Sequence, residues 1–295
     1  MMKKLEPKII KSFHQLAEAN KLAGLFGDID GDQYHRELPG VSKTDIEYAS
    51  WSLANMMARK NREEFDNDAL LIGKLLHSRI EFRLNLEEYK NLFAVKPKFT
   101  GTGARVAGEE WELAHKGATI LTESQAEDIE SMYAGLMANP QSRSIVESNG
   151  LYEETVFWTD PDSGVLCKCR PDKRMTEYLG QPTVIDWKTI GQFSKRHIQD
   201  AITDHHYYVS AAFTIDGLKT VGVEPGPYVF VFIEKSQPNR ILCVPANEID
   251  IEIGRRKYKR LLKQIAEAQK TGIWPGFADI GMHDWARQRE MEALA

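Results

Sequence analysis

The chain has 295 residues, of which 42% are hydrophobic and 27% charged, as in soluble globular proteins. This composition excludes collagen, coiled coil and wholesale disorder. The 43 acidic and 38 basic residues give a formal net charge of -5, so the chain is not a polycation that holds nucleic acid by bulk charge. Any nucleic-acid site must therefore be local.

The sequence also argues against a membrane or secretory segment and against cysteine-based sites. No run approaches the roughly 18 to 20 apolar residues of a membrane helix, and the N-terminus lacks the apolar core of a secretory signal, so we expect a cytoplasmic protein with no membrane contact. The three cysteines provide no disulfide framework and too few thiolates for a four-cysteine zinc or iron-sulfur site. Cys167 and Cys169 are predicted to be two small apolar side chains on one strand face.

The first part of the chain predicts helices and turns. Residues 1–38 mix a short amphipathic stretch with turn-rich sequence and are interpreted as an N-terminal elaboration. The absence of repeats and linkers predicts a single domain over 39–295. Ser42 is expected to cap a helix that continues to Trp51.

The helix predicted over 66–88 is capped by one of three residues and carries a notable face. Gly73, His77 and Glu81 follow one another at spacings of four, so they share one side of this helix, where the glycine would admit another backbone. The candidate capping residues are Asp66, Asn67 and Asp68.

A basic, glycine-rich stretch over 96–111 is predicted to be a mobile loop. It lacks the preceding strand and the Gly-Lys-Ser/Thr ending of a phosphate-binding loop, so a nucleotide site is disfavoured. The capping-box pattern that starts at Thr122 predicts a second helix, to about residue 138.

The rest of the chain alternates strands with helices. Strands are expected over 151–159, 165–175, 183–187, 227–235 and 240–246, and helices over 194–218 and from Asn247 or Glu248 to about residue 270. The first two strands form a hairpin. This order predicts an α/β fold with one mixed sheet.

Two acidic residues stand where predicted strands end. Asp172 closes the hairpin strand in Arg-Pro-Asp, and Asp186 closes the next strand in Ile-Asp-Trp-Lys-Thr. Adjacent antiparallel strands would bring the two carboxylates within a few Å, where they repel each other unless a cation lies between them. Oxygen ligands of this kind suit Mg²⁺ or Mn²⁺.

Lys188 follows Asp186 by two residues, so strand alternation points both side chains to one face and Trp187 toward the core. An ammonium beside a bound phosphate can stabilise the charge that develops during hydrolysis. The alternative interpretation, an exposed surface ion pair, is weakened by the preceding Pro171-Asp172.

Pro171-Asp172 followed by Asp186-X-Lys188 resembles the PD-(D/E)XK signature of phosphodiesterases. The resemblance implies a restriction-endonuclease-like core with a central mixed β-sheet flanked by helices. A longer ordered set of motifs resembles the nuclease domain of the RecE-type exonucleases (exonuclease VIII). It comprises Pro39-Gly-Val-Ser-Lys43, Gly73-X-X-X-His77, Leu166-Cys-Lys-Cys-Arg-Pro-Asp-Lys173, Ile185-Asp-X-Lys-Thr189 and Trp274-Pro275.

The resemblance implies roles for five residues. Asp172 and Asp186 would be metal ligands, Lys188 the catalytic lysine, His77 a further ligand, and the carbonyl of Trp187 a backbone ligand. Imidazole beside two carboxylates is acceptable for such a metal.

The implied activity is that of a Mg²⁺-dependent exonuclease acting on linear double-stranded DNA. It would degrade one strand from the 5′ end and leave a 3′ single strand for a RecT-type annealing protein in phage-type recombination. A ring-shaped homo-oligomer and a bacterial or prophage origin are expected on the same basis.

The helix after the catalytic strand departs from the family pattern. Related nucleases carry Gln-X-X-X-Tyr there, whereas this chain has Ser210 and Thr214 at those positions. Tyr207 or Tyr208 could substitute. The adjacent His205 and His206 point about 100° apart on a helix and cannot easily share one ion.

Other charged residues are weaker candidates. Arg170, Lys173 and Arg174 could hold the phosphate backbone without reading sequence, and Glu81 and Glu153 are second-tier acidic candidates. The basic cluster Arg255, Arg256, Lys257, Lys259, Arg260 and Lys263 is better interpreted as a solvated helix face.

Two rival functions stay open at this point. An endonuclease on the same core would cut closed circular DNA. A catalytically silent DNA-binding recombination accessory protein is disfavoured by the intact Asp, Asp, Lys set. The missing glutamine and tyrosine are nevertheless consistent with this alternative.

Overall fold

A five-stranded mixed sheet forms the centre of the protein. The computed structural model describes residues 22–27, 29–60, 68–277 and 281–294. In the order β10-β9-β8-β7-β4, the strands are Ile241–Pro245, Tyr228–Glu234, Gln181–Ile190, Lys173–Tyr178 and Leu151–Tyr152. β8 and β9 are parallel and the other neighbours antiparallel, which confirms the predicted α/β fold with a mixed sheet.

A second sheet holds strands that were predicted to continue into the first. It is antiparallel, in the order β1 (Gly24–Phe26), β5 (Thr155–Thr159) and β6 (Leu166–Cys169). The strand predicted over 151–159 is interrupted at Glu153, whose φ of 53° is incompatible with an extended strand. The strand predicted over 165–175 is likewise divided into β6 and β7. The single predicted sheet is therefore two sheets joined at these breaks.

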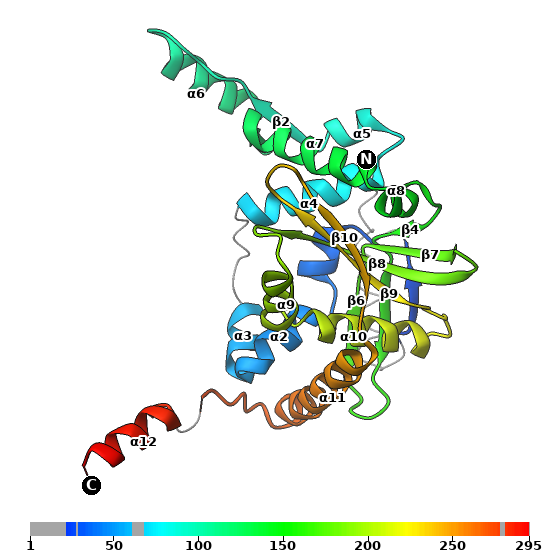
Figure 1. Ribbon diagram of the computed structural model, residues 1–295, viewed down its shortest axis with the longest axis vertical. Coiled ribbons are helices and arrows are strands. Elements are labelled where there is room, and N and C mark those ends of the chain that lie inside the picture. The colour runs from blue at the N-terminus through cyan, green and yellow to red at the C-terminus, as the bar shows by residue number, and fades with distance from the viewer. Residues whose placement is uncertain (1–21, 28, 61–67, 278–280, 295) are drawn as a thin grey trace.

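Helices cover both faces of the central sheet (Figure 1). α4 (Asp68–Glu81), α7 (Glu123–Ala138) and α8 (Pro140–Glu147) pack on one face, and α2 (Lys43–Trp51), α10 (Tyr207–Thr220) and α11 (Glu248–Thr271) lie on the opposite side. Alternate strand residues enter the two resulting cores. Val184 faces α10, whereas Ile185 and Trp187 face α4 and α7. The predicted burial of Trp187 is confirmed.

The capping predictions explain where two helices begin. Ser42 and Thr122 each form a capping box, with Asp45 and Gln125 respectively, so α2 and α7 start where the sequence indicates. Of the candidate caps for the helix predicted over 66–88, which is α4, residues 66 and 67 lie outside the described residues. That helix ends at Glu81 instead of 88, and a separate short helix, α5 (Leu86–Lys90), follows it.

Three further expectations differ in outcome. The helix predicted over 194–218 is two helices, α9 (Lys195–Asp204) and α10, because His206 between them has a φ of 52°. The predicted loop over 96–111 contains much of α6 (Ala104–Ala114), so that prediction is wrong. Cys167 and Cys169 are both buried in one core, as predicted.

Smaller elements surround this framework. β2 (Phe93–Lys96) and β3 (Thr119–Thr122) form a parallel pair, and α6 and α12 (Asp284–Ala293) extend away from the main body at opposite ends (Figure 1). α3 (Leu53–Lys60) follows α2, and η1 (Gln33–Glu37) precedes it. Among the described residues, no helix combines the length and apolar character needed to span a membrane.

Part of the N-terminal elaboration, residues 22–38, packs on the second sheet. β1 pairs with β5, and Leu22, Ile29 and Tyr34 surround the buried ring of Phe157. Residues 1–21 lie outside the described part. The described half of the elaboration therefore extends the sheet that carries β6, the strand leading to Asp172.

Candidate active site

Asp172 and Asp186 meet at the junction of β7 and β8. Asp172 lies in the connection between β6 and β7, not at the end of a continuous hairpin strand as predicted, and Asp186 lies within β8. The antiparallel register pairs Lys173 with Ile185, which brings the preceding and following residues together. The two carboxyl groups lie close enough to perturb each other's ionisation, and the Trp187 amide donates to Asp172 Oδ2 over 2.7 Å.

Asp186 is held from two further sides. The Lys188 ammonium donates to Asp186 Oδ1, and the Tyr228 hydroxyl donates to Oδ2 over 3.0 Å. Sequence reasoning missed Tyr228. Its signal is in the topology: Phe230 pairs with Asp186 across parallel strands, and Tyr228 shares the face of Phe230. A partly exposed lysine and a buried tyrosine thus fix the orientation of this carboxylate.

His77 and Glu153 complete a group of potential metal ligands. His77 Nδ1 lies 3.7 Å from Asp172 Oδ1, and the backbone of Trp187 lies near enough to the ring to influence its pKa. One ligand atom each from His77, Glu153 and Asp172 lies within 4.8 Å of the others. Glu153 separates β4 from β5 through its own left-handed backbone conformation. Its amide donates to the Asp172 carbonyl over 3.3 Å.

The helix face that carries His77 is only partly as expected. An added Cβ at Gly73 would meet no described atom within 4 Å, so the predicted approach of another backbone of this chain is absent. Glu81, one turn beyond His77, lies in electrostatic range of Glu153, and burial together with that charge raises its pKa to about 7. The second-tier candidates Glu81 and Glu153 therefore both border the site.

Arg170 supports Glu153 and is not available for DNA. Its Nε donates to Glu153 Oε2 over 2.6 Å and its Nη1 to the Ile29 carbonyl over 2.7 Å. With 8% of its side chain exposed, the guanidinium is committed to these partners, and the predicted phosphate contact is wrong. Its neighbour Arg174 is similarly engaged with Glu154.

Lys173 is also misassigned by the DNA-contact prediction. It is fully buried, and its Nζ donates to the carbonyls of Ile145 and Ser148, each over 2.7 Å. These carbonyls belong to the C-terminal end of α8, where a cation satisfies unpaired acceptors. Lys173 points to the opposite face of the sheet from Asp186, because strand alternation separates neighbouring positions.

Burial and charge divide the protonation states of the two carboxyl groups. Burial and the negative charge of Asp186 raise the pKa of Asp172 well above its usual value. Burial also opposes ionisation of Asp186, but the charges of Lys188 and Lys43 outweigh it and lower that pKa. One proton is therefore held between the two groups, mainly on Asp172.

The donor set fits a divalent cation. Burial lowers the pKa of His77, which favours the neutral imidazole that metals bind. Asp172, Asp186 and Glu153 add carboxylate oxygens, the ligands that a hard cation takes. His77, Glu153, Asp172 and Asp186 would hold the ion, and the Trp187 carbonyl, adjacent to His77, stays a predicted ligand.

Tyr207 lies in the site, whereas Tyr208 does not. The Lys188 ammonium lies 5.0 Å from the centroid of the Tyr207 ring. The Tyr208 hydroxyl contacts Lys257 over 3.3 Å and His206 over 3.4 Å instead. The positions of the family glutamine and tyrosine are occupied by buried Ser210 and Thr214, which lie on the core face of α10. Of the two tyrosines, Tyr207 is thus placed to replace that motif.

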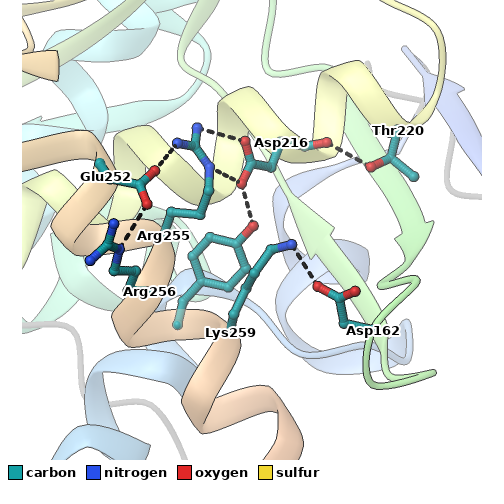
Figure 2. A network of polar contacts seen from close by, with 8 residues as sticks. Asp162, Asp216, Thr220, Glu252, Arg255, Arg256 and Lys259 are labelled. Carbon is teal, nitrogen blue, oxygen red and sulfur yellow. Dashed lines mark hydrogen bonds and ion pairs between the residues drawn. The ribbon is translucent and has the colours of Figure 1, made fainter.

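Three members of the basic cluster on α11, Arg255, Arg256 and Lys259, form ion pairs with acidic side chains, so this face is more than the solvated surface that was predicted. Figure 2 shows Arg255 between Asp216 and Glu252, with Arg256 on Glu252 and Lys259 on Asp162. Arg255 makes two hydrogen bonds to Asp216, of 2.7 and 2.9 Å, which join α11 to α10. Arg256 pairs within α11, and Lys259 reaches the turn between β5 and β6.

Comparison with known proteins supports the fold independently. The crystal structure of a protein from Eubacterium rectale, described as a candidate exonuclease, aligns with 97% of this chain and 93% of its own at a TM-score of 0.58 and 12% identity. The protein SSO0001 aligns over 66% of this chain and 86% of its own at 17% identity, but its TM-score of 0.31 is too low to indicate a shared fold. No curated protein matches the chain.

A family match covers most of the described fold. Residues 44–281 match the PDDEXK-like domain of unknown function DUF3799. This range contains His77, Glu153, Asp172, Asp186 and Lys188. The PD-(D/E)XK part of the sequence resemblance is thereby confirmed, and the chain belongs to the family of PDDEXK-like domains known as DUF3799.

Proposed function

We propose that this protein is a nuclease that hydrolyses DNA phosphodiester bonds with the help of a divalent cation. One observation carries the proposal: the clustered ligand atoms of His77, Glu153 and Asp172 adjoin the Asp186–Lys188 pair. Membership of a PDDEXK-like family agrees with this arrangement.

The chain's own residues have distinct tasks in this proposal. Asp172 and Asp186 would hold the cation once both are ionised, and the Trp187 amide fixes the orientation of the Asp172 carboxyl group. His77 and Glu153 close the same site from α4 and from the break between β4 and β5. Bound there, Mg²⁺ or Mn²⁺ would supply Lewis acidity toward a phosphate oxygen and a nearby water.

Lys188 acts on the phosphate. Its ammonium is fixed by Asp186 and by the Tyr207 ring, so it is oriented before the substrate arrives. The neighbouring carboxylates raise its pKa above that of a free lysine, so it is fully protonated at neutral pH. A fixed positive charge stabilises negative charge as it develops on the phosphorus oxygens.

The finer assignment is an exonuclease on linear double-stranded DNA that degrades one strand from its 5′ end. The ordered motifs shared with RecE-type nucleases support it, and so does the likeness in fold to a protein described as a candidate exonuclease. On the same grounds we propose a ring-shaped homo-oligomer and a RecT-type annealing protein as partner in phage-type recombination, in the bacterial cytoplasm. The rival endonuclease differs in requiring no DNA end.

A digestion assay tests the proposal. Linear duplexes labelled at the 5′ or the 3′ end, and a closed circular plasmid, are incubated with Mg²⁺, with Mn²⁺ or with EDTA. We expect early release of the 5′ label only, no cutting of the circle, and no activity in EDTA. Nicking or linearisation of the circle would identify the endonuclease, and inactivity on all substrates would leave only DNA binding.

A further inference from the structure

The Pro39–Lys43 motif has no role in the site described so far, and the structure shows what it fixes. Gly40 has a φ of 112°, and an added Cβ would approach Lys168 to 3.4 Å. The Val41 amide donates to the Leu166 carbonyl over 2.8 Å, and the Lys168 amide donates to the Val41 carbonyl over 2.9 Å. The motif therefore attaches the start of α2 to β6, the strand that leads to Asp172.

This attachment brings Lys43, the first residue of α2, to the catalytic side of the sheet. Its ammonium lies 5.8 Å from the centroid of the Tyr207 ring, and that of Lys188 lies 5.0 Å from the same centroid. One aromatic ring thus lies under two cations from distant parts of the chain. Neither composition nor strand alternation indicates this pairing.

Charges of both signs act on Lys43. Its ammonium is repelled by that of Lys188 and attracted by the carboxylates of Asp186, Glu47 and Asp172. Asp45, the acid in the first turn of α2, is buried and lies 3.8 Å from Arg59 and 3.6 Å from Lys60 instead. Asp186 is already engaged by Lys188, the two ammoniums repel each other, and the amino end of the helix adds positive potential, so a further anion within reach of both ammoniums would be stabilised.

We propose that Lys43 is a substrate-binding residue whose ammonium contacts the phosphate next to the scissile one on the strand that is cut. The inference rests on the proposed nuclease function, which gives the scissile phosphate to Lys188. Because both ammoniums reach the Tyr207 ring, they can serve consecutive phosphates of one strand. The Tyr207 ring then lies where it can contact the nucleotide between them.

The first test measures DNA binding without hydrolysis. Lys43→Gln, Lys43→Arg and the matched control Lys259→Gln, which loses a lysine paired with Asp162 (Figure 2), are compared by fluorescence anisotropy in EDTA with a labelled duplex carrying a short single-stranded end. We expect Lys43→Gln to weaken binding by about tenfold and to reduce the slope of log K against log salt by about 0.7 to 0.9. Lys43→Arg and Lys259→Gln should keep the wild-type slope.

The second test locates the phosphate. Single neutral methylphosphonates replace, one at a time, the phosphates around the first cleavage position, and wild type is compared with Lys43→Gln in a double-mutant cycle. At one phosphate bordering the scissile one, the methylphosphonate should lower the DNA affinity of the wild type to that of Lys43→Gln. The same substitution should not lower the affinity of Lys43→Gln any further. Equal losses for both proteins at every position would overturn the inference and indicate that Lys43 acts only through the charge of Asp186.

The outcomes separate this inference from the proposed function. Divalent-dependent cleavage by the wild type, with Lys43→Gln unchanged in affinity and salt slope, rejects the role of Lys43 alone. An inactive wild type rejects the nuclease function, while the anisotropy series still reports the phosphate contact. A wild type that binds no DNA rejects both. A melting temperature of Lys43→Gln close to that of the wild type shows that the fold is intact.

Discussion

The backbone amide of Trp187 donates a 2.7 Å hydrogen bond to the carboxyl group of Asp172. This contact links two acidic segments through the residue that separates Asp186 from Lys188. The same tryptophan is buried in the core under α4 and α7. The position of Asp172 is therefore tied to the packing of the central sheet.

Replacing Asp172 by Asn should stabilise the metal-free protein at higher pH. The pKa of Asp172 is raised in the folded state, so its contribution to the free energy of unfolding is present at low pH and is lost as pH rises through that pKa. Asn cannot ionise and keeps an oxygen for the Trp187 amide. Urea unfolding in EDTA over a pH series should show wild type losing stability relative to D172N with rising pH. A D172N protein that is equally destabilised at every pH would contradict the buried, protonated state.

Removing Lys188 or Asp186 should abolish hydrolysis while leaving the fold intact. Loss of one fixed transition-state charge costs about 100-fold or more in rate, so Lys188→Ala should fall at least that far in initial rate on linear duplex. Asp186→Asn should also lose the metal site. Lys259→Gln serves as the matched surface control and should keep full activity. Wild-type rates in Lys188→Ala would remove this residue from the mechanism.

Divalent cations should stabilise the protein through His77 and Glu153. A ligand that binds only the folded state adds about 2.7 kcal/mol at a concentration 100 times its Kd, which thermal unfolding detects. We expect Mn²⁺ or Mg²⁺ to raise the melting temperature of wild type and to raise it less in His77→Ala and Glu153→Gln. The effect should grow with pH, because the proton shared by the carboxyl pair must leave. Calorimetric titration of the same variants gives the number of ions bound.

Lys173→Met separates a structural lysine from a DNA contact. The side chain is buried and its ammonium serves carbonyls at the end of α8, so its loss should cost about 1 to 3 kcal/mol of stability through unpaired acceptors. DNA affinity and its salt dependence should not change. A reduced salt slope with wild-type stability would restore the DNA-contact role and refute the placement found here.

Gly254→Ala should disturb the junction that supports Tyr207. A Cβ at this position would lie 2.5 Å from the Tyr208 carbonyl oxygen, so α11 must move away from the start of α10. Overpacking of this kind costs about 1 to 3 kcal/mol. Chemical unfolding should show the loss, and cleavage should weaken more than in the surface variant Lys259→Gln. A fully stable Gly254→Ala protein would show that the two helices can separate at no cost.

Local sequence rules predicted the elements that local interactions determine. Ser42 and Thr122 cap their helices because a hydroxyl satisfies backbone amides within three residues. The two-residue alternation of a strand places Asp186 and Lys188 on one face and Trp187 in the core. The carboxyl pair followed from the expectation that neighbouring strands are antiparallel, which the register confirms.

Only the tertiary structure decided which charges meet and which are used up inside the fold. Arg170 and Lys173 stand beside Asp172 in sequence, yet one holds Glu153 and the other caps α8. The left-handed conformations of Glu153 and His206, which no sequence pattern indicates, break a strand and a helix and so place Glu153 and Tyr207. Lys43 and Tyr228 come from segments distant in sequence and act on Asp186 only because the fold brings them near it. Electrostatic and hydrogen-bonding interactions depend on distance in space, which local sequence rules do not give.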